Sequence, residues 1–114
     1  METVISADTY SLEWNPETRT AALKGILRLN GLEEYAPISR FLLDAVPQGS
    51  MTLDLRGLEF LNSSGIATLS KFVIEIRNRK TVDLTVLGSK AVAWQSKSLI
   101  NLSKLMPALR MDFS

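Results

Sequence analysis

The 114-residue chain contains no cysteine and no histidine. Without thiols and imidazoles it can form neither a disulfide nor a zinc site ligated by these residues, and a Ser-His-Asp triad is impossible. No apolar run approaches the ~20 residues of a membrane-spanning helix, and the N-terminal sequence lacks the charged and apolar pattern of a signal peptide. These absences predict a cytoplasmic protein, and no metal or cofactor is expected.

An excess of charge of one sign is also missing. Lys and Arg number 13 and Asp and Glu number 12, which gives a formal net charge of +1. Because a nucleic-acid-binding face normally shows as an excess of basic residues, nucleic acid is not expected as a partner. The length suits a single domain, residues 1–114, in which residues 1–9 are expected to form a loosely ordered start.

The pattern that organises the chain lies between residues 51 and 66. Apolar and polar residues alternate along Met51–Arg56, which is typical of a strand with one buried face. Leu58, Phe60 and Leu61 are too apolar for a free loop, so we expect a tucked turn there. A helix is predicted next, because apolar residues recur with helical spacing at Ile66, Leu69, Val73 and Ile76.

Asn62, Ser63 and Ser64 stand directly before this helix. Asn and Ser are preferred N-cap residues, because a short side-chain oxygen can accept from the unpaired N–H groups of the first turn. A helix N-terminus also carries partial positive charge and suits an anion such as phosphate. The serines can therefore act as caps, as a nucleophile or as sites of phosphorylation, and a cap is the ordinary role at this position.

The remaining elements follow from the same two periodicities. Residues 10–14 and 21–29 are predicted to form an antiparallel pair of strands, and residues 82–86 and 109–113 two further strands. In a helix predicted over residues 32–46, we place Pro37 in the first turn, because proline in a helix interior clashes with the carbonyl four residues earlier. Ser89 is expected to cap a third helix with Ala91, Trp94 and Gln95 facing inward.

Strands linked through helices pair in parallel. Here every strand alternates, whereas parallel strands covered on both faces would be continuously apolar. The sequence therefore predicts an α/β domain with a central mixed sheet of four to five strands and with helices mainly on one face. The opposite face is expected to be more polar and to bear Lys24, Asp54 and Asp83.

The segment Asp54–Ile66 resembles the signature of the STAS domain, which is shared by sulfate transporters and anti-sigma factor antagonists. In that signature a strand ends in Asp-Leu, a small hydrophobic turn follows, and Asp-Ser-Ser-Gly opens a helix. The likeness extends over Thr20–Leu105. The run Leu29–Pro37, together with Asn62–Gly65 and Trp94-Gln95, is more particularly similar to a cyanobacterial subgroup of STAS-like regulators.

This resemblance implies a STAS-like fold and a non-enzymatic switch module of the anti-sigma factor antagonist type. Ser63 matches the serine that a partner kinase phosphorylates in the family, and Ser64 is the alternative. The implied partner is an anti-sigma factor or a serine-kinase-like regulator, and a weak homo-oligomer is left open.

Right-handed crossovers place the C-terminal ends of neighbouring parallel strands along one edge of the sheet. This predicts that Arg28–Asn30, Asn62–Ser64 and Gly88–Lys90 share one neighbourhood. The candidate partner-binding residues in it are Arg28, Asn30, Asn62, Ser63, Ser64 and Gly65.

Two of these residues depart from the STAS pattern. Asn62 replaces the aspartate before the phosphorylated serine, and Arg28 aligns with a second aspartate that is common near the end of the second strand. Both changes remove negative charge, so a phosphate on Ser63 would be accommodated electrostatically. The kinase could then differ from the usual one, and phosphorylation could strengthen an interaction rather than abolish it. An unmodified structural cap is the equal alternative.

Other functions compete with a switch module. A small-molecule or nucleotide-binding domain could use the same helix N-termini, although no G-x-x-x-x-G-K-[ST] loop is present. A hydrolase could use Ser63 as nucleophile, with Lys90 the only base to suggest, but nothing in the spacing places the two together. Trp94 is either a docking anchor or, more simply, a residue packed under the third helix.

Overall fold

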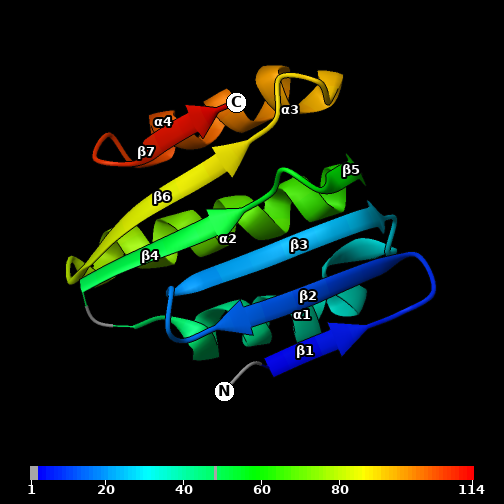
Figure 1. Ribbon diagram of the computed structural model, residues 1–114, viewed down its shortest axis with the longest axis horizontal. Helices are drawn as coiled ribbons and strands as arrows, with labels where there is room; N and C mark the ends of the chain where they lie inside the picture. The colour runs from blue at the N-terminus through cyan, green and yellow to red at the C-terminus, as the bar shows by residue number, and fades with distance from the viewer. Residues whose placement is uncertain (1–2, 48) are drawn as a thin grey trace.

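The computed structural model describes residues 3–47 and 49–114. Figure 1 shows a twisted sheet with the helices behind it. The strands are β1 (Thr3–Ser6), β2 (Tyr10–Asn15), β3 (Thr20–Leu27), β4 (Gly49–Asp54), β5 (Leu58–Leu61), β6 (Val82–Gly88) and β7 (Arg110–Phe113). The helices are α1 (Gly31–Ala45), α2 (Ser63–Arg79), α3 (Ala93–Ser98) and α4 (Leu102–Leu105), with a 3-10 turn η1 (Leu99–Asn101) between the last two. None of the helices in these described ranges is both long and apolar enough to cross a membrane.

The strands lie in the order β1-β2-β3-β4-β6-β7, and β5 pairs with β3. The first three strands are antiparallel, whereas β3, β4, β6 and β7 pair in parallel across helical connections. Strand β3 has two parallel partners on one side, because Thr20–Ala22 pairs with β4 and Gly25–Leu27 pairs with β5. The predicted α/β class, the mixed sheet and the placement of helices mainly on one face are therefore confirmed (Figure 1).

The predicted number of strands is wrong, because the described residues form a sheet of seven strands rather than four to five. Within the segment expected to be a loose start, Thr3–Ser6 forms β1, paired with β2. The tucked turn predicted after Gly57 is the strand β5, paired with β3. Each of these strands has 4 residues. This is too few for apolar and polar residues to alternate clearly, so neither segment could be recognised as a strand from the sequence.

The alternation predicted for the central strand is confirmed. In β4, Met51 and Leu53 are buried, whereas Asp54 is half-buried on the open face of the sheet, with Lys24 and Asp83 exposed as expected. The large hydrophobic residues that the two long helices bury are Tyr35, Ile38 and Leu42 from α1, and Leu69, Phe72, Val73 and Ile76 from α2. Full burial of a large apolar side chain stabilises by about 1.5–3 kcal/mol, so apolar contact is what holds the helical layer on the sheet.

Pro37 lies inside α1 and not in its first turn, which corrects the prediction. The helix is continuous from Gly31, so no separate turn precedes the proline. Proline removes one hydrogen bond, the one to the carbonyl of Glu33 four residues earlier. Both Glu33 and Pro37 are exposed, so water can hydrate that carbonyl while the opposite side of the helix stays buried through Tyr35 and Ile38.

The third helix is divided into α3, η1 and α4, and Ser89 does not cap it. The N-cap position is Val92, and the Ser89 Oγ instead accepts from the N–H of Ala91 in a turn, at 3.2 Å. Ala91 is exposed rather than inward-facing, whereas Gln95 is buried as predicted. The helical segment thus begins after Ser89, the residue that was predicted to cap it.

Candidate functional site

The start of α2 is held by one side chain, that of Asn62. Its Oδ1 accepts from the N–H of Gly65 at 3.0 Å and from the hydroxyl of Tyr35 at 2.6 Å. Its Nδ2 donates to the carbonyl of Leu29 at 2.8 Å. Asn62 is therefore the N-cap, and it also joins the end of β3 and helix α1 to the first turn of α2.

Tyr35 is the buried member of this hydrogen-bonded cluster. Burial raises the pKa of its hydroxyl, so the group is protonated at neutral pH and donates. The Leu27 carbonyl, at 3.2 Å, is a second acceptor beside Asn62 Oδ1. The geometry also explains why an amide suits position 62. An aspartate there would place a carboxylate oxygen, which cannot donate, opposite the carbonyl oxygen of Leu29.

Ser63 and Ser64 are the first two residues of α2, and neither is the cap. Ser63 is exposed and Ser64 is half-buried. The Thr68 hydroxyl donates to the Ser64 carbonyl at 2.9 Å, one turn further along the helix. The Ser63 hydroxyl is consequently the more accessible of the two to another protein.

Gly65 is buried and does not face solvent. A Cβ on this residue would overlap the Cδ1 of Leu61 and would lie 2.8 Å from the hydroxyl of Tyr35. The absence of a side chain therefore allows Tyr35 to reach Asn62 beneath the first turn. Among the predicted partner-binding residues, Gly65 supports the turn from inside.

Arg28 and Asn30 are exposed at the same edge of the sheet. The guanidinium carbon of Arg28 lies 4.7 Å from the centroid of the Phe60 ring, a cation–π arrangement. Asn30 precedes α1 without a side-chain cap bond, and its backbone N–H donates to Glu34 Oε1 at 3.0 Å. Glu34 thus binds the first turn of α1 in addition to compensating the helix dipole.

Different sets of hydrogen bonds hold the three segments predicted to share one neighbourhood. Asn62 is bonded to Leu29, so the ends of β3 and β5 meet. Ser89 and Lys90 are bonded elsewhere: the Ser89 N–H donates to Gln95 Oε1 at 2.8 Å, and the Lys90 N–H donates to the Ser114 carbonyl at 3.0 Å. The backbone of Lys90, the residue suggested as a base for a hydrolase, is thus bonded to the end of the chain.

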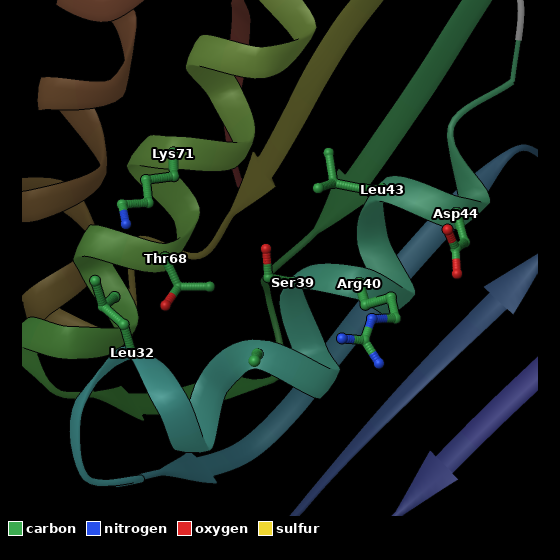
Figure 2. A pocket seen from close by; sticks show the side chains of 8 residues that line it. Leu32, Ser39, Arg40, Leu43, Asp44, Thr68 and Lys71 are labelled. Atoms are coloured by element: carbon green, nitrogen blue, oxygen red, sulfur yellow. The ribbon is translucent and has the colours of Figure 1, made fainter.

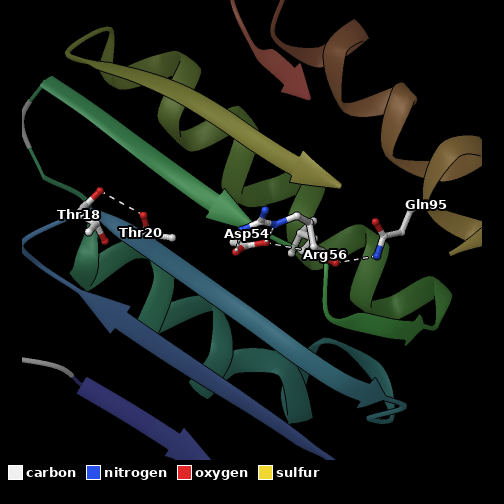
Figure 3. A network of polar contacts seen from close by, with 6 residues as sticks. Thr18, Thr20, Asp54, Arg56 and Gln95 are labelled. Atoms are coloured by element: carbon white, nitrogen blue, oxygen red, sulfur yellow. Dashed lines mark hydrogen bonds and ion pairs between the residues drawn. The ribbon is translucent and has the colours of Figure 1, made fainter. Parts of the chain in front are cut away.

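Gln95 is the polar residue whose role sequence reasoning missed. It is 0% exposed, and its Nε2 donates to the carbonyls of Leu55 at 2.6 Å and of Leu58 at 2.9 Å. Figure 3 shows this side chain reaching from α3 toward the segment that follows β4. Trp94 adds a bond from its Nε1 to the Glu59 carbonyl at 2.9 Å, so α3 fixes β5 from the side opposite to β3.

A groove of about 350 Å³ runs between α1 and α2. Figure 2 shows side chains from both helices around it, and its lining residues are Leu32, Ala36, Ser39, Arg40, Leu43, Asp44, Thr68 and Lys71. Leu32 is 44% exposed at the start of α1. Because Thr68 is bonded to the first turn of α2, the groove begins about one helical turn from the serines.

The open face carries a separate ion pair, with Arg56 Nη2 2.9 Å from Asp54 Oδ2 (Figure 3). Burial acts to raise the pKa of Asp54, but hydrogen bonds from the Arg56 side chain and backbone outweigh it and hold the pKa below its usual value. In the described part of the chain, no group of three or more acidic side chains is placed to hold a metal ion. At the start of α2, by contrast, the exposed group is the Ser63 hydroxyl, and the groove lies about one helical turn away.

No family model and no curated protein matches the sequence. Solved structures, in contrast, match 96–100% of the chain. SiaC of Pseudomonas aeruginosa superposes with a TM-score of 0.65 and 15% sequence identity, covering 100% of this chain and 96% of that chain.

A second match comes from the crystal structure of the diguanylate cyclase SiaD in complex with its activator SiaC, from the same organism. It has a TM-score of 0.70 and 14% identity, and it covers 96% of each chain. Apo-SiaC of Pseudomonas aeruginosa matches with a TM-score of 0.63 and 14% identity, over 100% of this chain and 97% of that chain. At these identities the similarity establishes the fold, a mixed α/β domain of the SiaC type.

Proposed function

We propose that the chain is a non-enzymatic regulatory protein that docks a protein partner through the face formed by α1, α2 and the Asn62–Ser64 turn. The observation that carries this proposal is the continuity of the face: Ser63 is exposed at one end, and the α1–α2 groove with the exposed Leu32 continues from it. An apolar centre with a polar rim is typical of protein interfaces. The fold shared with SiaC, described as the activator of SiaD, supports a regulatory role.

The partner that we propose is a regulated protein whose activity this chain adjusts. SiaC is found in complex with the diguanylate cyclase SiaD, and a diguanylate cyclase is therefore the first candidate class. The resemblance of Asp54–Ile66 to the STAS signature supports a second class, an anti-sigma factor or a serine-kinase-like regulator. Either partner would be controlled through docking and charge, which require no catalytic group in this chain.

Ser63 is the proposed switch, with Ser64 as the alternative. A phosphate on Ser63 would lie at the first position of α2, where the positive end of the helix favours it. It would also add negative charge to the docking face and so change the affinity for the partner. Arg28, Asn30 and Asn62, at the same edge, complete the proposed partner-binding set.

We expect Leu32→Glu to weaken partner binding by about tenfold or more, because it replaces an exposed apolar side chain of the proposed interface with a charge. The measurement is biolayer interferometry with a purified diguanylate cyclase from the same genome, followed by an anti-sigma factor and a serine-kinase regulator. Lys24→Glu, exposed on the open face, is the control and should leave the affinity unchanged. Equal binding by unmodified protein and Leu32→Glu would contradict the proposed docking face.

Phosphorylation is tested separately, by incubating the purified chain with lysate and ATP and mapping phosphate by mass spectrometry. The expected result is phosphate on Ser63, since this hydroxyl is exposed at the helix start. Ser63→Ala should lose the label, whereas Ser96→Ala, which alters an exposed serine on α3, should keep it. Phosphate on other residues, with none on Ser63 or Ser64, would remove the switch from the proposal.

A further inference from the structure

A second pocket, of about 370 Å³, lies between strand β2 and the C-terminal half of α1. Its lining residues are Trp14 from β2 and Phe41, Asp44 and Ala45 from α1. The three residues of α1 are three and four positions apart, so they share one face of the helix. Small-molecule sites have volumes of about 300–1,000 Å³, so this pocket is large enough for a small ligand.

The walls of the pocket are mainly aromatic. Trp14 and Phe41 are both half-buried, and each packs against the hydrophobic core while it also lines the pocket. The face of an aromatic ring carries partial negative charge and attracts a cation, most strongly for tryptophan. Two such rings around one cavity therefore favour an organic cation, whose alkyl groups also gain apolar contact.

The charged group of the pocket is the carboxylate of Asp44, which is exposed. The ion pairs of the described residues involve other carboxylates, and Asp44 makes no hydrogen bond among residues 3–47 and 49–114. Arg40, four residues earlier on α1, does not pair with it, and Figure 2 shows the guanidinium apart from the carboxylate. The pocket thus has a negative charge that the described part of the chain does not neutralise.

The end of α1 adds to this negative potential. The C-terminus of a helix carries partial negative charge, which basic side chains in the last turn normally compensate. The last turn of α2 has Arg77 and Arg79, whereas the last turn of α1, whose residues are all described, has no basic residue and contains Asp44. A carboxylate at the negative end of a helix is unfavourable, and a cation bound beside it would relieve the repulsion.

We propose that this pocket binds a small soluble organic cation with an alkylated ammonium group, held between Trp14 and Phe41 and beside the carboxylate of Asp44. An anion would be repelled by Asp44 and by the end of α1. A metal ion such as Ca²⁺ or Mg²⁺ takes about six or more oxygen ligands, and this pocket offers one carboxylate between apolar walls. The site goes beyond the proposed docking function and does not depend on it.

The test is a titration of the purified chain with choline chloride at constant ionic strength, followed by NMR. The signal is the indole N–H of Trp14, which the Trp14→Phe variant identifies. The expected result is a saturable shift with a dissociation constant of about 1 mM or lower. The neutral analogue 3,3-dimethylbutan-1-ol, in which carbon replaces the ammonium nitrogen, should bind at least about tenfold more weakly, because it lacks the charge that the rings and the carboxylate attract.

Two variants test the residues of the pocket. Asp44→Asn and Phe41→Leu should each weaken choline binding by about tenfold, since one removes the carboxylate and the other an aromatic wall. Asp83→Asn, which removes an exposed carboxylate on the open face of the sheet, is the matched control and should bind choline like the unmodified chain. Without choline, Asp44→Asn should raise the melting temperature, because it removes a negative charge from the negative end of α1.

Several outcomes would overturn the proposal. These are no saturable shift with choline up to about 50 mM, equal affinities for choline and its neutral analogue, or unchanged choline binding by Asp44→Asn. A lower melting temperature for Asp44→Asn without choline would show that the carboxylate already has a stabilising partner, and this would also count against the site. Circular dichroism of each variant verifies that a loss of binding is not a loss of fold. Because no protein partner is needed, this result is independent of the docking experiments.

Discussion

Gln95→Leu is expected to lower the free energy of unfolding by about 3 kcal/mol, the largest effect among the polar residues of this chain. Leucine has nearly the same volume but can neither donate to the Leu55 and Leu58 carbonyls nor accept from the Ser89 N–H. An unsatisfied buried polar group costs about 1–3 kcal/mol, and the Leu55 carbonyl keeps one other donor, the N–H of Leu58. The measurement is urea denaturation followed by circular dichroism.

Gln95→Glu distinguishes lost hydrogen bonds from lost packing, because it keeps the shape of the side chain. At neutral pH a carboxylate would face two carbonyls inside the core, and both burial and these acceptors raise its pKa above the unfolded value. Its stability should therefore be lowest at neutral pH and should increase as the pH falls through the raised pKa. A Gln95→Glu protein as stable as the unmodified chain at neutral pH would show that the two carbonyls do not depend on this donor.

Asn62→Ala is the second substitution with a large expected effect, a loss of about 2 kcal/mol. It removes the N-cap acceptor of Gly65, the nearer acceptor of the Tyr35 hydroxyl and the donor to the Leu29 carbonyl. Loss of a cap alone costs about 1 kcal/mol, and the loss of the donor to the partly buried Leu29 carbonyl adds to that cost. Thermal unfolding, with the melting temperature as readout, measures the change.

Asn62→Asp, which restores the residue found in the STAS pattern, separates these contributions. The carboxylate can still accept from the Gly65 N–H and the Tyr35 hydroxyl. It replaces the Nδ2 donor, which lies 2.8 Å from the Leu29 carbonyl oxygen, with an oxygen that faces the same carbonyl. We expect a stability between that of Asn62→Ala and that of the unmodified chain. If Asn62→Asp were the more stable protein, the bond to Leu29 could not be the reason for an asparagine at this position.

The fold was largely predictable because the long elements follow simple periodicities. The spacing of apolar residues in the sequence predicts both the buried face of β4, with Met51 and Leu53, and the apolar face of α2. Strand β5 could not be predicted in the same way, because its 4 residues have the burial order buried, exposed, exposed, buried, which breaks the strand period of two. Pro37 was placed wrongly because local sterics were weighed without the burial of Tyr35 and Ile38 that keeps α1 continuous.

The candidate site was predictable only in part. A cap at Asn62, Ser63 or Ser64 could be predicted, because capping depends on a residue type at a helix start, and the structure shows that the cap is Asn62. Its bonds to Tyr35 and Leu29 could not, since they depend on how β3 and α1 pack across separations of 27 and 33 residues. Gln95 carries no local signal, because its partners are carbonyls 37 and 40 residues away.

Strand β3 has three neighbours in the sheet, β2 on one side and β4 followed by β5 on the other. An error in its alignment during folding would therefore displace three pairings at once, and with them the segment that ends in Asn62. Folding intermediates with a misaligned β3 would expose Leu23 and Leu27, which are 1% exposed in the native chain. Correct alignment of this one strand is thus a condition for the serines to be displayed at all.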